Sequence, residues 1–274
     1  MKIKFLGTAA YEGVPSLFCT CRVCQKAMKE GGRELRSRSQ ALINDELLLD
    51  FPPDTVWHFQ RFCLDWTKIG DCLITHDHSD HLYPEDALMA VEAYSNQHRP
   101  LHFYAAQSGY EKLMACVPFA ETAGAGISLV EPGRRFTAGE GGKYSVLPLR
   151  ANHEDATSPV IYSISCEGKR LLYAHDTGVF YEDTWKGLKE ESRYDLISLD
   201  CTGCLEKAGP DYHMSLKDIR GVLERMRSEK LADEKTTVVL NHFSHNGGLT
   251  YEEMCREAEK EGMIVSYDGL ELVV

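Results

Sequence analysis

The chain has 274 residues, 30 of them basic and 42 acidic, and its formal net charge at pH 7 is −12. An apolar share of 43% and a charged share of 26% are typical of a globular protein and exclude global disorder. The acidic balance argues against a strongly basic nucleic-acid surface, because proteins bind phosphate backbones through Lys and Arg.

The location of the protein is inferred from its apolar stretches. None of them approaches the roughly 18 residues that cross a bilayer. The apolar run at the N-terminus is too short for a signal peptide, so we expect a cytoplasmic protein. In that reducing compartment the 10 cysteines are expected to serve as thiols, metal ligands or catalytic groups rather than disulfides.

Runs rich in Val, Ile, Leu and Tyr, separated by Gly or polar breaks, predict strands. The predicted strands are Lys2–Leu6, Gln40–Ile43, Glu46–Asp50, Cys72–Ile74, Leu101–Tyr104, Tyr144–Leu149, Val160–Ser165, Arg170–Ala174, Leu196–Leu199, Thr236–Leu240, Ile264–Tyr267 and Glu271–Val273. Helices are predicted at Asp54–Phe62, Pro84–Gln97, Ser108–Met114, Tyr181–Glu190, from Ser215 through Met226, and from Thr250 to Gly262. Strands come in groups with helices between them, which indicates two sheets with helices outside in a single domain, residues 1–274.

The segment Thr75 to His81 carries the strongest chemical signal and directly follows an apolar strand. Residues two apart in an extended segment point to the same side, so His76 and His78 can share one metal. A turn after them can bring Asp80 and His81 toward a second metal. Imidazole and carboxylate ligands suit zinc, manganese or iron.

This H-x-H-x-D-H motif resembles that of the metallo-β-lactamase superfamily of metal-dependent hydrolases. The resemblance implies an αββα sandwich of two mixed sheets with helices on the outer faces and a two-metal site along one edge. Three later positions match the remaining ligand motifs of that superfamily, each following a predicted strand: His153, Asp176 and His242.

The resemblance also implies how the ligands are shared. His76, His78 and His153 would bind one catalytic metal, and Asp80, His81 and His242 the other, with Asp176 bridging the two. Asp50, at the end of a predicted strand, matches a superfamily aspartate that orients a histidine ligand. Its alternative role is that of a turn-forming aspartate.

A second motif places three cysteines within six residues, at Cys19, Cys21 and Cys24. Closely spaced thiolates favour a closed tetrahedral zinc site, which needs one further ligand. His245 lies three residues after His242 and can point away from the catalytic metals to complete it. This pattern resembles the cyclic phosphodiesterases of the carbon–phosphorus lyase pathway, where such a zinc braces the N-terminal loop. A second pair, Cys201 and Cys204, could be a redox pair or another metal site, but a packed Cys201 beside the predicted strand is favoured.

Two adjacent metals can share a hydroxide and neutralise charge on a phosphodiester, but the ligands alone do not choose the substrate. His213, just before a predicted helix, resembles the non-ligand catalytic histidine of the cyclic phosphodiesterases and of ribonuclease Z relatives. It can bind a phosphate oxygen or protonate the leaving group. Asp80 is expected to hold the nucleophile as well as bind metal.

The sequence therefore predicts a metal-dependent phosphodiesterase for a small cyclic or nucleotide-like phosphodiester, with two catalytic divalent metals and one structural zinc. Ribonuclease Z-like RNA processing and hydrolysis of a thioester, lactone or β-lactam are the alternatives. The full ligand set argues against a non-enzymatic metal-binding sensor. A long nucleic acid and a membrane are not expected as partners, and the sequence leaves a homodimer open.

Overall fold

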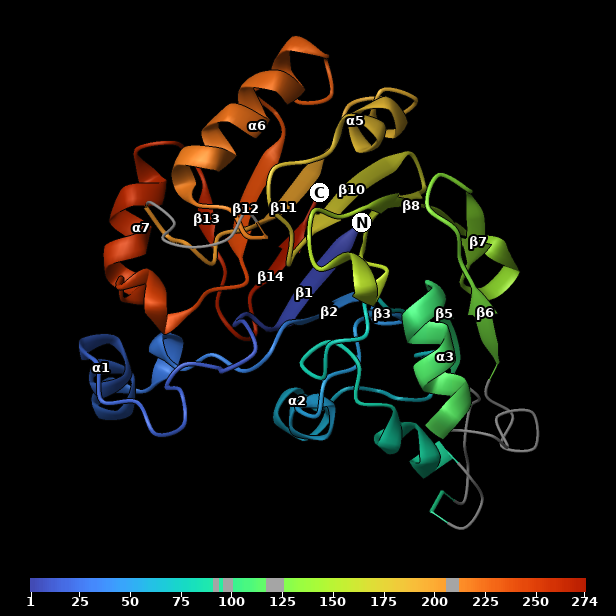
Figure 1. Cartoon of the computed structure of the whole chain (residues 1–274), viewed down its shortest axis with the longest axis horizontal. Coiled ribbons are helices and arrows are strands. Elements are labelled where there is room, and N and C mark those ends of the chain that lie inside the picture. The colour runs from blue at the N-terminus through green and yellow to red at the C-terminus, as the bar shows by residue number, and fades with distance from the viewer. Residues whose placement is uncertain (91–93, 96–100, 117–125, 206–211) are drawn as a thin grey trace.

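The computed structural model describes residues 1–90, 94–95, 101–116, 126–205 and 212–274. Two seven-stranded sheets form its centre, and helices lie outside them (Figure 1). The helices α5, α6 and α7 lie on one side of the strands and α2 and α3 on the other. The predicted αββα sandwich with two mixed sheets is thus confirmed.

The first sheet has the strand order β14-β1-β2-β3-β4-β5-β6. Its strands are β1 (Lys2–Gly7), β2 (Gln40–Ile43), β3 (Leu47–Leu49), β4 (Asp71–Leu73), β5 (His102–Ala105), β6 (Ile127–Leu129) and β14 (Glu271–Val273). The strands from β3 to β6 are parallel, whereas β14, β1, β2 and β3 pair antiparallel. Because β3 and β4 run parallel, the residues that follow them meet at one edge.

The second sheet has the order β13-β12-β11-β10-β9-β8-β7. Its strands are β7 (Phe136–Ala138), β8 (Tyr144–Arg150), β9 (Val160–Cys166), β10 (Lys169–Ala174), β11 (Leu196–Asp200), β12 (Thr237–Asn241) and β13 (Ile264–Val265). A tight turn at Glu167 and Gly168, both with positive φ, joins β9 to β10 as an antiparallel hairpin. The strands β10, β11 and β12 are parallel, so their carboxyl ends also meet at one edge.

The helices pack their apolar faces on the sheets, except the first, whose Val23 and Ala27 pack against Val14 and Leu35. They are α1 (Arg22–Glu30), α2 (Thr55–Phe62), α3 (Gln107–Cys116), α5 (Glu182–Leu188), α6 (Leu216–Ser228) and α7 (Tyr251–Glu259). Short 3₁₀ segments occur at η1 (Gly32–Glu34), η2 (Pro84–Ala90), η3 (Glu140–Gly142), η4 (Asp155–Thr157) and η5 (His245–Gly247). The predicted capping pairs are formed, with Ser215 and Asp218 starting α6 and Thr250 and Glu253 starting α7.

Apolar residues of both sheets meet between them in one buried cluster, which includes Phe5 of β1 and Tyr173 of β10. A second cluster packs α5, α6 and α7 on the outer face of the second sheet, with the fully buried Trp185 among its members. A third packs α2 and α3 on the first sheet. This core holds the strand ends, and thus the loops beyond them, in fixed positions.

Some elements differ from the sequence-based expectation. The segment Pro84–Ala90 is 3₁₀ rather than α-helical, and residues 91–93, 96 and 97 of that predicted helix lie outside the described part. The short strands β6 and β7 and the helix α1 were not predicted. The buried apolar face of α1 consists of Val23 and Ala27, two positions that are too few to give a helical pattern. Among the described residues, no helix is long and apolar enough to span a bilayer.

Candidate metal centre

The predicted metal ligands lie in loops that follow strands of both sheets. His76, His78, Asp80 and His81 follow β4 of the first sheet. His153 follows β8, Asp176 follows β10, and His242 follows β12 of the second sheet. The paired sheets bring these loops together at one edge of the sandwich, as expected from the sequence.

His76, His78, His153 and Asp176 form the first cluster, with one ligand atom of each within 4.8 Å of the others. The His76 Nε2 and His78 Nδ1 atoms are 3.0 Å apart, and His153 Nε2 is 3.2 Å from the same His78 atom. Asp176 Oδ2 lies 3.2 Å from His76 Nε2. These nitrogen and oxygen atoms therefore point into one small space.

Asp80, His81, Asp176 and His242 form the second cluster, and all four residues are buried. The Nε2 atoms of His81 and His242 face each other at 3.2 Å. His81 Nε2 also lies 3.4 Å from Asp80 Oδ2 and 3.4 Å from Asp176 Oδ2. Asp176 belongs to both clusters, and this is the arrangement that the superfamily resemblance implies for a bridging carboxylate.

Asp50 fixes one of the histidine rings from behind. Its Oδ2 is 2.8 Å from His81 Nδ1, and its Oδ1 accepts hydrogen bonds of 2.8 Å from the Thr75 amide and hydroxyl. Because Nδ1 donates to this carboxylate, His81 keeps Nε2 free for a metal. The aspartate thus orients a ligand, in agreement with the first of the two roles considered from the sequence.

Three of these carboxylate and imidazole residues have a left-handed backbone. Asp50, Asp176 and His242 have φ values of 65°, 52° and 60°. Positive φ is uncommon for residues other than Gly and carries strain of about 1–3 kcal/mol. The strain occurs where the chain turns sharply after a strand, and it aims the three side chains into the same edge.

The donor set fits divalent cations. His153 Nδ1 and Asp176 Oδ1 are buried without a hydrogen-bond partner among the described residues, and they lie 3.5 Å apart, with His213 Nδ1 3.2 Å from the Asp176 oxygen. Ring nitrogens that face one another across 3.0–3.2 Å gain a common partner when a cation lies between them. Imidazole and carboxylate groups in this number are the ligands that proteins use for zinc, manganese and iron.

The charge states of His76 and Asp176 suit a cation as well, whereas at His81 burial acts to lower the pKa but the Asp50 and Asp80 carboxylates outweigh it and raise the pKa well above its usual value. Burial lowers the pKa of His76 to about 4, with a further lowering by the neighbouring His81 ring. Burial acts to raise the pKa of Asp176, but the surrounding His242, His76 and His81 rings outweigh it and hold that pKa well below its usual value. A neutral imidazole and an ionised carboxylate are the forms that bind metal.

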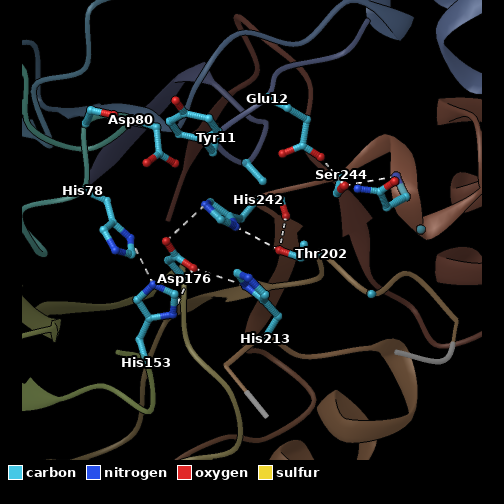
Figure 2. A pocket seen from close by; sticks show the side chains of 15 residues that line it. Tyr11, Glu12, His78, Asp80, His153, Asp176, Thr202, His213, His242 and Ser244 are labelled. Atoms are coloured by element: carbon cyan, nitrogen blue, oxygen red, sulfur yellow. Dashed lines mark hydrogen bonds and ion pairs between the residues drawn. The ribbon is translucent and has the colours of Figure 1, made fainter. Parts of the chain in front are cut away.

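The clusters form the floor of a cavity of about 640 Å³. Figure 2 shows the side chains around this space, with Tyr11, Glu12 and Ser244 from other loops facing the clusters. Its lining consists of Ala10, Tyr11, Glu12, His78, Ser79, Asp80, His153, Asp176, Thr202, Gly203, His213, His242, Ser244, Asn246 and Gly247. The volume is in the range of small-molecule sites.

His213 lines this cavity and is paired with a carboxylate that sequence reasoning missed. Asp200, at the end of β11 and fully buried, lies 3.1 Å from His213 Nδ1 through its Oδ2. The same oxygen is 3.2 Å from His242 Nδ1, and Oδ1 accepts from the amides of Thr202 and Met214. Its position at the carboxyl end of a strand parallel to β10 and β12 was the signal that could have found it.

Asp200 changes the acidity of the histidine that it holds. Burial acts to lower the pKa of His213, but the Asp200 carboxylate outweighs it, and the pKa rises to about 9. The partner effect holds the pKa of Asp200 below its usual value, against the burial that acts to raise it. This raised pKa favours the protonated form of His213 at neutral pH, and its Nδ1 also lies 3.2 Å from Asp176 Oδ1.

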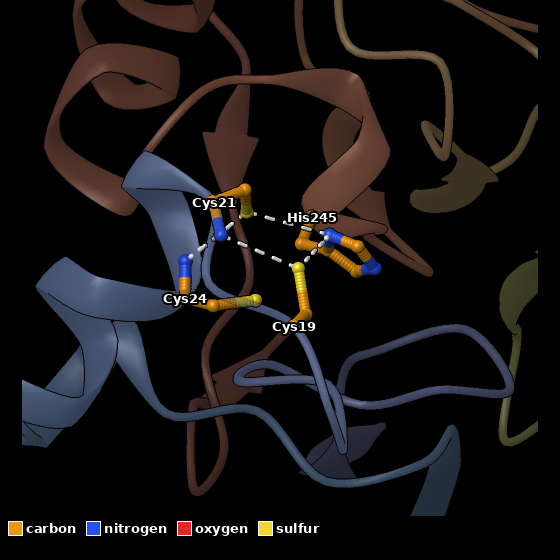
Figure 3. A group of neighbouring side chains, drawn as sticks. All are labelled: Cys19, Cys21, Cys24 and His245. Carbon is orange, nitrogen blue, oxygen red and sulfur yellow. Dashed lines mark hydrogen bonds between the residues drawn. The ribbon is translucent and has the colours of Figure 1, made fainter.

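The second predicted cluster is also assembled. Cys19, Cys21, Cys24 and His245 offer ligand atoms within 4.8 Å of one another (Figure 3). His245 Nδ1 is 3.5 Å from Cys19 Sγ and 3.5 Å from Cys21 Sγ. Burial acts to raise the pKa of Cys21, but the backbone N–H of Cys24 and the His245 ring outweigh it and lower the pKa to about 6. Three sulfurs and one imidazole nitrogen are the ligand set of a closed zinc site.

The cysteine pair at positions 201 and 204 lies apart from this group. Cys201 is fully buried and Cys204 is 1% exposed, and burial raises the pKa of both thiols. Neither belongs to a metal-like cluster among the described residues. The expectation of packed, unreactive thiols agrees with this burial.

Paired His/Asp clusters at the edge of two facing mixed sheets define the class of metal-dependent hydrolases with the metallo-β-lactamase fold. A family model described as "Beta-lactamase superfamily domain" matches residues 48–243, which hold both clusters and His213. The chain therefore belongs to the beta-lactamase superfamily. The cysteine motif and His245 lie outside the matched region.

Solved structures share the fold along the whole chain. A diphosphatase of the PhnP family matches with a TM-score of 0.75 and 19% identity, covering 100% of this chain and 97% of that one. Zinc-bound PqqB from Methylobacterium extorquens matches with a TM-score of 0.73, 18% identity and 100% of both chains. The short form of human tRNase Z matches with a TM-score of 0.65 and 18% identity, covering 100% of this chain and 99% of that one.

A curated relative matches over a shorter stretch. An octanoyltransferase of Porphyromonas gingivalis is 31% identical over 112 residues, which are 39% of this chain and 21% of that protein. The chain thus spans about a fifth of the length of the curated relative that it matches.

Proposed function

We propose that this protein is a phosphodiesterase that uses two divalent metals to hydrolyse a small cyclic or nucleotide-like phosphodiester. The observation that carries the proposal is the position of His213 beside the two clusters, 3.1 Å from Asp200 in the wall of one cavity. A positioned acid protonates the leaving alkoxide of a diester, and His213 lies where it can do so; a lactone also expels an alkoxide, so turnover on a panel of substrates separates the two.

The metals are assigned to the two clusters and to the cysteine site. His76, His78 and His153 would hold one catalytic metal, and Asp80, His81 and His242 the other, with Asp176 between them. Bound divalent cations supply Lewis-acid stabilisation of phosphoryl charge and lower the pKa of water. We take zinc as the metal at all three sites, with manganese or iron as alternatives at the catalytic pair.

Residues of the chain supply the remaining functions. Asp80 accepts the proton of the attacking water and orients it, because its carboxylate lies on the cavity floor beside His81. His213 Nε2 donates a proton to the leaving alkoxide on the opposite side. Asp200 keeps the ring in the orientation and charge state for this transfer.

The cavity favours a compact substrate. Its volume of about 640 Å³ suits a sugar phosphate or a nucleotide. With a net charge of −12, the chain offers little attraction to a long phosphate backbone. A tRNase Z, whose name indicates that it acts on RNA, has the same fold. The fold alone therefore does not decide between a small substrate and an RNA.

The test uses His213→Ala in the metal-loaded protein, with His102→Gln as a matched control outside the cavity. Wild type and control are expected to hydrolyse bis-p-nitrophenyl phosphate and a ribonucleoside cyclic phosphate. On the ribonucleoside cyclic phosphate the variant should lose about 10²–10⁴-fold in kcat while its metal content stays the same, and the loss on bis-p-nitrophenyl phosphate should be smaller because p-nitrophenolate leaves without a proton. Equal turnover by the variant contradicts the role of His213. Turnover of a lactone, nitrocefin or unprocessed transfer RNA in place of the diesters contradicts the proposed function.

A further inference from the structure

The loop of residues 10–14 forms one wall of the cavity and is fixed to the rest of the protein. Ala10 N donates to Phe243 O at 3.0 Å, and Val14 and Arg36 exchange two backbone hydrogen bonds of 2.9 and 2.8 Å. Gly13 takes the positive φ of 69° that closes the loop. Between these anchors, Glu12 projects into the cavity (Figure 2).

The carboxylate of Glu12 is held by two residues that follow the His242 ligand. The Ser244 hydroxyl donates to Glu12 Oε1, and His245 Nε2 lies 3.7 Å from the same oxygen. Ser244 is itself fixed, since its oxygen accepts the Asn246 amide at 3.0 Å. Figure 2 shows the other carboxylate oxygen of Glu12 turned toward the open space.

This arrangement connects the wall to the cysteine cluster. His245 directs Nδ1 to the thiols of Cys19 and Cys21, which leaves Nε2 on the side of Glu12. A histidine that binds metal through one nitrogen commonly donates its other N–H to a carboxylate. The Ser244 hydrogen bond thus orients Glu12 through one oxygen, with His245 facing the same oxygen at 3.7 Å, and the other oxygen is available to a ligand.

The charge of Glu12 separates it from the rest of the lining. Of the carboxylates that line the cavity within the described residues, Asp80 and Asp176 belong to the metal clusters and Glu12 does not. No Lys or Arg is among the lining residues of that same part of the chain. A substrate group that reaches this wall therefore meets a carboxylate that has no Lys or Arg beside it among the described lining residues.

We infer that Glu12 determines substrate specificity: its free oxygen accepts hydrogen bonds from hydroxyl groups of the substrate and repels a second phosphate. This inference rests on the proposed phosphodiesterase function. The preferred substrate is a phosphodiester whose remaining part is an uncharged polyol, such as an unphosphorylated ribose. A charged acceptor strengthens a hydroxyl hydrogen bond, and a like charge beside the binding position disfavours a competing ligand that carries a second phosphate.

The experiment compares two probes, a ribonucleoside cyclic phosphate and the same compound with a terminal phosphate on its sugar. Their dissociation constants are measured by calorimetry at low temperature with the metal-loaded protein. We expect wild type to bind the uncharged-sugar compound about tenfold tighter, a difference of about 1.4 kcal/mol. Glu12→Gln, which keeps the shape, should reduce this ratio to near unity.

Two further variants make the result specific. Glu131→Gln removes the same charge from an exposed ion pair with Arg134 outside the cavity lining, and it should keep the wild-type ratio. Ser244→Ala removes the hydroxyl that orients Glu12, so it should give an intermediate ratio. Metal content is measured in each variant and should be unchanged in Glu12→Gln.

The outcomes separate this inference from the proposed function. Equal ratios in wild type and Glu12→Gln, or no binding of either probe by wild type, overturn the role of Glu12. A wild-type preference that Glu12→Gln abolishes supports that role, even if neither probe is hydrolysed. Failure of wild type to hydrolyse any phosphodiester contradicts only the proposed function.

Discussion

The substitution Asp200→Asn tests whether the carboxylate at the end of β11 fixes the tautomer of His242, a predicted metal ligand. Asp200 Oδ1 accepts two backbone amides, so in Asp200→Asn the amide oxygen must stay on that side. The new NH₂ group then replaces Oδ2 and faces His213 Nδ1 and His242 Nδ1, at the 3.1 and 3.2 Å now spanned to a carboxylate. A donor at this point no longer accepts the Nδ1 proton of either ring.

The consequence for His242 follows from its tautomer. Without an acceptor at Nδ1 the proton moves to Nε2, the nitrogen that faces His81 and would bind metal. Thr202 moderates the effect, because its Oγ1 lies 2.9 Å from the same Nδ1 and can still accept. Loss of such a supporting contact lowers metal affinity about 10–100-fold, or about 1.4–2.7 kcal/mol. We expect about tenfold for Asp200→Asn and about a hundredfold with Thr202→Val added.

The assay is a competition titration of metal-loaded protein with a chromogenic chelator, which resolves the affinity of each bound metal. Only the metal at Asp80, His81 and His242 should weaken, and the one at His76, His78 and His153 should not. Thr202→Val alone is the control and should change affinity by less than Asp200→Asn. Unchanged affinities in Asp200→Asn, or equal weakening of both metals, would refute the reasoning.

Three further predictions concern stability and the cysteine site. Burial lowers the pKa of His58 to about 4 from an ordinary value of 6.5, so between these pH values the unfolded chain binds a proton that the folded one does not. The free energy of unfolding should therefore decrease by roughly 3 kcal/mol as the pH falls from 6.5 to 4. The variant His58→Gln should flatten the curve of urea midpoint against pH relative to wild type. Cys21→Ser should lose one metal per chain by mass spectrometry of metals and melt several degrees lower, whereas Cys63→Ser, an exposed thiol, should change neither. Gly7→Ala would place its Cβ 1.9 Å from the backbone oxygen of Arg38, so chemical denaturation should show a loss of at least about 1–3 kcal/mol; an unchanged midpoint would contradict this packing.

Strong local patterns predicted most of the fold. Buried strands such as β2 coincide with their expected bounds, and the capped helix α6 begins where Ser215 and Asp218 indicate. The segment Pro84–Gln97 misled because Pro and acidic residues at its start resemble the beginning of an α-helix, whereas residues Pro84–Ala90 are 3₁₀. The strands β6 and β7 have three residues each, too few for a period-two pattern.

The site was predictable where a motif marks each position. His76, His78 and their partners gather as expected because each follows a strand, and strand ends converge in this architecture. Asp200 and Glu12 were missed because no motif marks them. Their roles come from contacts between residues far apart in the chain, such as Glu12 with Ser244, which sequence spacing does not contain. The assignments of metals and of the acid, and the single-domain organisation, stay predictions.

The left-handed backbone at Asp50, Asp176 and His242 also limits how the thermal stability of this protein can be increased. At such φ values Gly is the residue that fits without strain, so Gly substitutions would relieve local energy while removing a functional side chain. Relief of strain and loss of the metal centre therefore point in the same direction at Asp176, whose Oδ1 has no hydrogen-bond partner among the described residues, whereas Gly at position 50 would also remove the hydrogen bonds of Asp50 to Thr75 and His81. A selection for thermal stability alone would erode the centre at Asp176, and an engineered variant keeps its chemistry only if stability is sought elsewhere in the fold.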